Sequence, residues 1–193
     1  MLKKKERGEW GYLKYRRTSL TLMFFGVLAA AAAIFVIGLA LNKWETTNIF
    51  TVVAILGVLP AAKILVLMIV VYPHKAINEE EKIFLDGLLQ EEDKIFYDAV
   101  FTSSERSMHL DAIFVTGHQI IGYTSDKKDK IDKIEAYFKN EMNLRKLDHT
   151  VFITNSDKTL ANRFKMRSAN EELSGKQQRD RENILEFIKV SIV

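Results

Sequence analysis

The chain has 193 residues, of which 48% are hydrophobic, with 28 lysines and arginines against 25 aspartates and glutamates. It contains no cysteine, which excludes disulfides, thiolate metal sites and thiol nucleophiles. Residues 1–17 carry seven basic and two acidic side chains, whereas residues 73–193 carry 19 basic and 22 acidic ones. The basicity therefore belongs to an N-terminal arm, and a domain that coats nucleic acid is not expected.

The basic juxtamembrane arm, residues 1–17, reads MLKKKERGEWGYLKYRR and has two interpretations. Its charges can orient the chain during membrane insertion, or they can contact anionic lipid headgroups, each contributing about 1 kcal/mol. The two interpretations are compatible, and membrane lipids are therefore expected partners. The basic residues are Lys3, Lys4, Lys5, Arg7, Lys14, Arg16 and Arg17.

Two apolar segments, residues 18–41 and 49–72, follow the arm. The first holds no charged residue and the second holds only Lys63. Each is about 36 Å long as a helix, enough to cross a hydrocarbon core of about 30 Å. The first run is longer than the core of a signal peptide, which has roughly 7–15 apolar residues. We therefore predict an uncleaved transmembrane hairpin over residues 18–72.

The distribution of basic residues predicts the topology of this hairpin. The arm is dense in lysine and arginine, whereas the connector 42–48 holds only Lys43 and Glu45. By the positive-inside rule the N-terminus is cytoplasmic, the connector is outside, and residues 73–193 form a cytosolic domain. The prediction is a multi-pass protein of the cell membrane, with two spans and both termini in the cytoplasm.

Small residues in the first span (Gly26, Ala29–Ala33 and Gly38) favour close helix packing, either on the second span or between copies of the chain.

Lys63 lies about 13 Å from the cytoplasmic end of the second span, near the middle of the membrane. A lysine at that depth costs at least about 2.5 kcal/mol unless it finds water, headgroups or a partner. Neither span contains Asp, Glu or His. Two interpretations stay open: Lys63 snorkels to the headgroups, or it meets a cavity or an acidic residue of another protein or protomer. Pro60, one turn earlier, can kink the helix there.

Residues 73–193 are predicted to form one α/β domain of order α-βββ-α-β-α-α, which makes the whole chain α+β. Asn78 is a candidate helix cap, and Gly117-His118 a candidate two-residue turn. The expected helices are 76–89, 130–147, 157–169 and 176–190, and the expected strands are 94–102, 108–116, 119–125 and 149–155.

The stretch LDAIFVTGHQIIGYTSDKK, residues 110–128, has a carboxylate in its first apolar strand and Asp-x-Lys after its second. It resembles the strand pair of nuclease-related members of the restriction-endonuclease-like (PD-(D/E)xK) superfamily, and the resemblance covers residues 76–155. It implies a catalytic set of Asp111, Asp126 and Lys128, in which the two carboxylates hold Mg²⁺ and the lysine stabilises charge.

The pattern departs from that family in the second strand. When the apolar strands are aligned, Tyr123-x-Ser125 stands where Glu-x-Lys is expected. Asp126 also precedes a run of helical periodicity, so it can be a helix cap rather than a ligand. Asp111 can likewise be a structural polar residue. We therefore predict either a degenerate nuclease-like fold or an unrelated α/β domain. Neither needs a cofactor, and Mg²⁺ is required only under the nuclease alternative.

The sequence as a whole predicts a membrane-anchored scaffold or binding module without catalytic activity. It would act at the inner membrane face with a protein partner or a second copy of itself. The alternative is a membrane-tethered, Mg²⁺-dependent nuclease. The histidines lack the spacing of a zinc site, and Ser103-Ser104 lie in no hydrolase motif.

Overall fold

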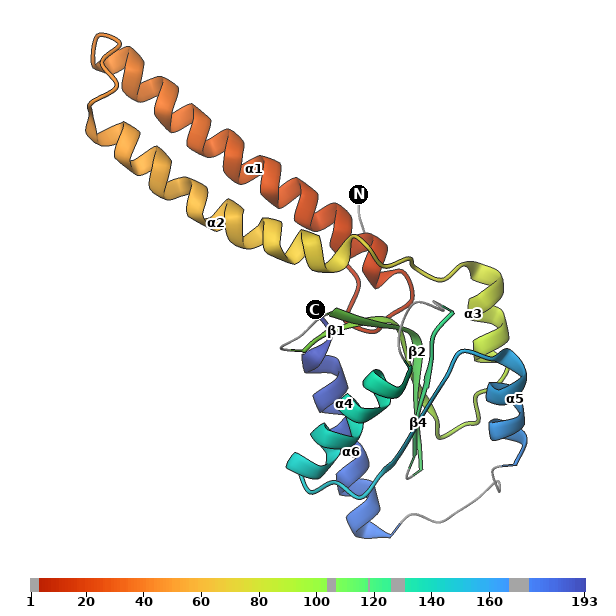
Figure 1. Cartoon of the computed structure of the whole chain (residues 1–193). Helices are drawn as coiled ribbons and strands as arrows, with labels where there is room; N and C mark the ends of the chain where they lie inside the picture. Colours follow the sequence, from red (N-terminus) through yellow and green to blue (C-terminus); the bar gives the residue numbers. More distant parts are fainter. Residues whose placement is uncertain (1–3, 104–106, 118, 126–130, 167–173) are drawn as a thin grey trace. The chain divides into compact units, whose positions relative to one another are not determined.

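The computed structural model describes residues 4–103, 107–117, 119–125, 131–166 and 174–193. They form two compact units: a helical unit, Lys14–Pro73, and an α+β unit made of the residues up to Leu13 together with His74–Val193. The predicted mixed α+β class is confirmed, because two long apolar helices precede a four-stranded mixed sheet with its own helices (Figure 1).

The helical unit consists of α1 (Tyr12–Leu41) and α2 (Ile49–Val71). Asn48 caps α2, since its side chain accepts a hydrogen bond from the backbone N–H of Thr51 at 3.0 Å. Pro60 lies inside α2. Both helices are long and apolar enough to cross a membrane.

Small residues bring α1 and α2 together. A Cβ added to Gly38 would lie 2.3 Å from the Cβ of Phe50, and one added to Gly57 would lie 3.6 Å from the Cβ of Ala31. A Cβ on Gly26 would meet nothing within 4 Å. The small residues of α1 therefore do not share one face: Ala31 and Gly38 belong to the seam between the helices, and Gly26 does not.

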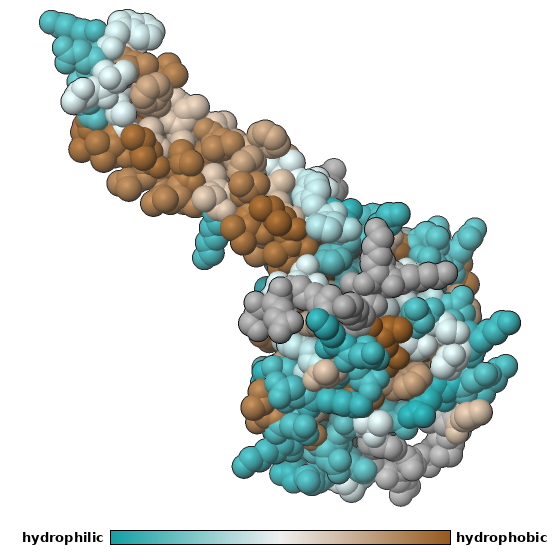
Figure 2. All heavy atoms as spheres, in the orientation of Figure 1, coloured by the Kyte–Doolittle hydropathy of each residue, from teal (hydrophilic) through white to brown (hydrophobic). Residues whose placement is uncertain are grey.

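Large apolar side chains cover the outside of both helices, and Figure 2 shows this apolar surface along their length. Such an extended apolar surface is unfavourable in water and is typical of helices that lipid covers. Among the exposed side chains are Leu22, Met23, Phe25, Val36, Ile37, Leu41, Ile49, Val52, Ile55, Leu56, Leu59, Val66 and Ile69.

The α+β unit has one sheet, of order β1-β2-β3-β4. The first three strands form an antiparallel meander, and β4 pairs parallel to β3 after the crossover helix α4. The elements are α3 (Glu79–Asp86), β1 (Lys94–Thr102), β2 (Ser107–Thr116), β3 (Gln119–Tyr123), α4 (Ile131–Leu144), β4 (Thr150–Thr154), α5 (Asp157–Lys165) and α6 (Gly175–Ser191).

Helices cover both faces of this sheet (Figure 1). On the face of α3 and α5, Leu85 and Leu160 pack in one core cluster with Phe114 of β2. On the face of α4 and α6, the ring of Phe101 meets that of Phe138 edge-on, with centroids 5.1 Å apart. The unit is therefore a three-layer α/β/α arrangement with a core on each side of the sheet.

Polar residues before three of these helices fix where they begin. Asn78 forms a capping box with Glu81 before α3, as its position in the sequence indicated. Ser156 caps α5 and Ser174 caps α6, each by accepting a backbone N–H of the first turn.

Candidate functional site

Two buried carboxylates lie opposite each other on neighbouring strands. Tyr97 pairs with Ala112 and Ala99 with Leu110, which places Asp98 of β1 across from Asp111 of β2. Asp98 is 1% exposed and Asp111 is 3% exposed. Charged side chains are almost never buried to this degree unless they are hydrogen-bonded or paired.

The backbone of β1 changes its course at Asp98. Its φ is +49°, in the left-handed region that residues other than glycine rarely adopt. Tyr97 packs in the cluster on the α3 side, whereas Phe101 contacts Phe138 on the α4 side. In a regular strand residues 97 and 101 would point to the same face. The left-handed residue therefore shifts the alternation, so that β1 contributes to both cores.

Each of these carboxylates accepts a backbone N–H from outside its strand. Asp98 Oδ1 accepts from the N–H of Ile77 at 2.9 Å, and Asp111 Oδ2 accepts from the N–H of Ser125, just after β3. Ile77 lies in the segment that leads into α3. The two side chains thus tie segments before α3 and after β3 to the middle of the sheet.

Two histidines lie next to Asp111. His109 Nδ1 is 3.7 Å from Asp111 Oδ1, and the His109 ring stacks on His74 with centroids 5.0 Å apart. His74 Nε2 lies 3.3 Å from Ser107 Oγ.

The structure describes only one of the three residues of the predicted catalytic set. Asp111 is buried in the sheet and holds the N–H of Ser125, whereas Asp126 and Lys128 lie outside the described residues. Within the described ranges, no group of three or more His, Asp or Glu side chains is placed to hold a metal ion.

Within the α+β unit, residues 6–10 of the basic arm pack on the sheet and its helices. The N–H of Tyr97 in β1 donates to the carbonyl of Gly8 at 2.8 Å, and Trp10 packs on the core cluster of the α3 side. Gly8 has φ +82°, and a Cβ there would lie 2.4 Å from Cδ1 of Phe96. Lys82 lies 5.8 Å from the Trp10 ring, within the range of a cation–π contact. We call residues 6–10 the docked arm.

The docked arm also meets the C-terminal helix. Arg7 donates to the carbonyl of Val190 at 2.8 Å, and Lys189 pairs with Glu6 at 2.7 Å, a hydrogen bond that lowers the pKa of Glu6. The N–H of Val193 donates to the carbonyl of Val100 at 3.0 Å. Both terminal segments therefore bond to β1, an edge strand whose polar backbone would otherwise offer a pairing site.

The other basic residues of residues 1–17 have different surroundings. Lys4 and Lys14 are exposed, Lys5 and Arg16 are half-buried, and Lys3 lies outside the described residues.

Arg17 binds the end of α2, in the helical unit. It donates to the carbonyl of Tyr72 at 3.2 Å and to that of Val71 at 3.5 Å, and its guanidinium lies 5.7 Å from the centre of the Tyr72 ring. A cation at this position satisfies the last carbonyls of the helix and opposes its negative dipole end.

Lys63 points away from the seam between α1 and α2. Ala61, two residues earlier and on the opposite side of the helix, is 1% exposed. Lys63 is exposed, as are Leu59 and Val66 about one turn to either side. The lysine thus lies on the apolar outer surface of α2.

Two tyrosines on the α3 and α5 side donate to carboxylates. Burial, reinforced by a hydrogen bond to Asp86, raises the pKa of Tyr97 above its usual value. Burial and a hydrogen bond to Asp157 raise the pKa of Tyr123 in the same way. Both hydroxyls therefore stay protonated, as donors, at alkaline pH values where a free tyrosine begins to ionise.

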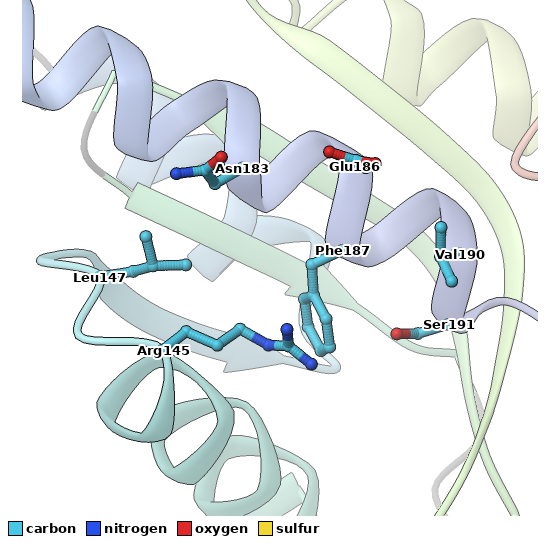
Figure 3. A pocket seen from close by; sticks show the side chains of 7 residues that line it. All are labelled: Arg145, Leu147, Asn183, Glu186, Phe187, Val190 and Ser191. Atoms are coloured by element: carbon cyan, nitrogen blue, oxygen red, sulfur yellow. The ribbon is translucent and has the colours of Figure 1, made fainter.

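A pocket of about 350 Å³ lies between α6 and the loop that follows α4 (Figure 3). The Arg145 guanidinium covers the Phe187 ring at 4.3 Å and pairs with Glu141 at 3.3 Å. This arginine thus already has an aromatic and an anionic partner within the chain. The lining residues are Arg145, Leu147, Asn183, Glu186, Phe187, Val190 and Ser191.

Comparisons with known proteins gave no match: no protein-family model, no curated protein and no solved structure matches this chain.

Sequence reasoning found Asp111 but missed Asp98, although the same signal was present. Asp98 interrupts the apolar strand KIFYDAVFT as Asp111 interrupts the next strand. The docked arm had a weaker signal, because Gly8 and Gly11 mark turns but do not indicate what the arm contacts.

Proposed function

We propose that the chain is a membrane-anchored binding module that holds its α+β unit at the inner face of the cell membrane. The observation that carries this proposal is the outer surface of α1 and α2, where large apolar side chains are exposed along both helices. The α+β unit, in contrast, encloses most of its large apolar residues in two cores. Lipid around the helices would remove the apolar surface from water.

The proposed topology keeps both termini in the cytoplasm. Basic residues precede α1, and few charges lie between the helices, as expected when the connector crosses the membrane. The contacts of the arm are compatible with this arrangement, since Glu6 to Trp10 and the C-terminal helix α6 belong to one compact unit. Lipid headgroups remain proposed partners of the exposed residues Lys4 and Lys14.

Binding rather than catalysis is supported by what the buried carboxylates do. Asp98 and Asp111 each accept a backbone N–H and tie a connecting segment to the sheet. A buried carboxylate that satisfies a backbone N–H in this way stabilises the fold of the domain. We propose that the partner is a protein or a second copy of the chain, and that no cofactor is needed.

The nuclease alternative keeps one observation in its favour. One residue of the predicted catalytic set, Asp111 of β2, is buried in the sheet, and a second buried carboxylate, Asp98, occupies the facing position of β1. Under this alternative, the detergent-solubilised full chain cleaves DNA or RNA only with Mg²⁺, and Asp111→Asn abolishes cleavage. Cleavage that is equal in Asp111→Asn, or absent from the wild type, would exclude this alternative.

The main proposal is tested by extraction and by topology. We expect the full chain to stay in the membrane pellet after alkaline carbonate, and a reporter after Val193 to be modified only by cytoplasmic reagents. A reporter inserted in the connector at Glu45 is the matched control and should be reached only from outside. Release by carbonate, or a C-terminal reporter reached from outside, would contradict the proposal.

A further inference from the structure

The outer face of α2 combines a cation and a backbone acceptor within two turns. Leu56, Pro60 and Lys63 are spaced by four and three residues, so they lie on one side of the helix, and all three are exposed. Pro60 has no N–H and cannot donate to the carbonyl of Leu56. This side of α2 therefore carries the N–H donors of Lys63 and the carbonyl of Leu56, which receives no hydrogen bond from Pro60. The rest of the surface around them is apolar.

Snorkelling covers only part of the distance from Lys63 to the headgroups. Lys63 precedes the end of α2 at Val71 by eight residues, or about 12 Å of helix. The four-carbon stem of a lysine spans about half of that distance. A partner at the same depth would satisfy the ammonium group without any tilt or local thinning of the membrane.

A second copy of this chain cannot supply that partner. Residues 18–41 and 49–72 contain no Asp, Glu or His, and Glu45 in the connector belongs to the opposite end of the helices. The small residues Gly57 and Ala61, which could bring two copies together, are turned toward α1 or buried. The counter-charge has to come from a different protein.

We propose that the face of α2 around Lys63 docks a transmembrane helix of a different protein that carries an Asp or Glu at mid-membrane depth. The three ammonium donors of Lys63 bind that carboxylate, and the apolar neighbours Leu59 and Val66 pack beside it. A hydroxyl or amide donor one to two turns along the partner helix can bond the carbonyl of Leu56. This inference rests on the proposed membrane anchoring and specifies the partner of the module.

The test uses photo-crosslinking of the full chain in native membranes. A photoreactive residue at Val66, 60% exposed and about 60° around α2 from Lys63, is compared with one at Ile69, 65% exposed and about 120° around α2 from Lys63. We expect a protein adduct from position 66 and not from position 69. The crosslinked segment of the partner, identified by mass spectrometry, should contain an Asp or Glu.

Variants of Lys63 test whether the adduct depends on the positive charge at position 63 or only on the size of the side chain. Lys63→Arg should keep the adduct, and Lys63→Met should reduce it about ten-fold, as expected for one polar contact between helices. Moving the charge two turns along the same side of α2, in Lys63→Met with Val70→Lys as the second change, should not restore it. Exchanging the charges, with Lys63→Glu and lysine in place of the partner's acid, should restore the adduct.

Three outcomes would overturn the inference: an unchanged adduct in Lys63→Met, an adduct only with lipid, or an adduct only with a second copy. Every variant is first pelleted after alkaline carbonate. If the wild type is released, the membrane anchor itself has failed. If it is retained without a partner adduct at position 66, only the docking inference has failed.

Discussion

Gly8→Ala should detach the docked arm from β1. Gly8 has φ +82°, where an alanine costs about 1–2 kcal/mol relative to glycine. The new Cβ would also lie 2.4 Å from Cδ1 of Phe96 and 3.1 Å from its Cβ, so either the ring or the arm has to move. If the arm moves, the 2.8 Å hydrogen bond from Tyr97 to the Gly8 carbonyl is lost, at a further cost of about 1 kcal/mol.

Gly11→Ala is the matched control. Gly11 has the same φ of +82°, but a Cβ there meets nothing within 4 Å. The backbone strain is shared, so the difference between the variants reports the contact with β1. We expect Gly8→Ala to weaken docking by about 2 kcal/mol more than Gly11→Ala, which is about thirty-fold in the ratio of docked to free arm.

Trp10 makes this difference measurable. The chain has two tryptophans, and in a Trp44→Phe background the emission of Trp10 reports whether the arm lies on the core. Gly8→Ala should shift the emission to longer wavelength, expose the ring to iodide quenching, and open the arm to protease. Identical emission and protection in the two variants would refute the proposed packing of the arm.

Three further predictions follow from close contacts and protonation. Gly38→Ala should separate the two apolar helices, α1 and α2, and lower the thermal midpoint in detergent, whereas Gly26→Ala should leave it unchanged. Gly122→Ala should destabilise the chain by about 1–3 kcal/mol in denaturant titration, because the new Cβ would lie 2.5 Å from Cδ1 of Ile153. Adding Ile153→Val, which removes that Cδ1, should restore most of the lost stability. The pKa of Tyr97 is higher in the folded than in the unfolded chain, so its protonated hydroxyl stabilises the fold fully below about pH 10. That contribution to the free energy of unfolding is lost as the pH rises further. Tyr97→Phe, which has no hydroxyl, should therefore show a smaller fall of the denaturation midpoint at alkaline pH.

Local patterns were sufficient to predict the elements of the α+β unit. Strand 94–102 is observed with the predicted bounds, because apolar and β-branched residues end at polar turns on both sides. The helix predicted over 76–89 is limited to Glu79–Asp86, since Asn78 starts it and Gly87 follows it. Gly175, expected between two helices, is instead the first residue of α6, since Ser174 takes the capping position.

The candidate site was less predictable, because it depends on contacts between distant segments. Asp98 and Asp111 are 13 residues apart, and only the register of β1 with β2 brings them together. The left-handed backbone of Asp98 is equally invisible, since an aspartate in an apolar strand does not indicate a positive φ. The docked arm meets β1 across almost ninety residues, a contact that periodicity cannot report.

The middle of β1 gives these separate observations a common explanation. The N–H of Tyr97 holds the carbonyl of Gly8, and the carboxylate of Asp98, the next residue, holds the N–H of Ile77. Gly8 lies in the segment that leads into α1, and Ile77 lies in the segment that leaves α2. Both chain passages between the α+β unit and the two apolar helices are thus fastened at adjacent residues of one edge strand. The backbone of Asp98, with φ +49°, shifts the alternation of β1 at this point, where its carboxylate binds the segment that leads into α3.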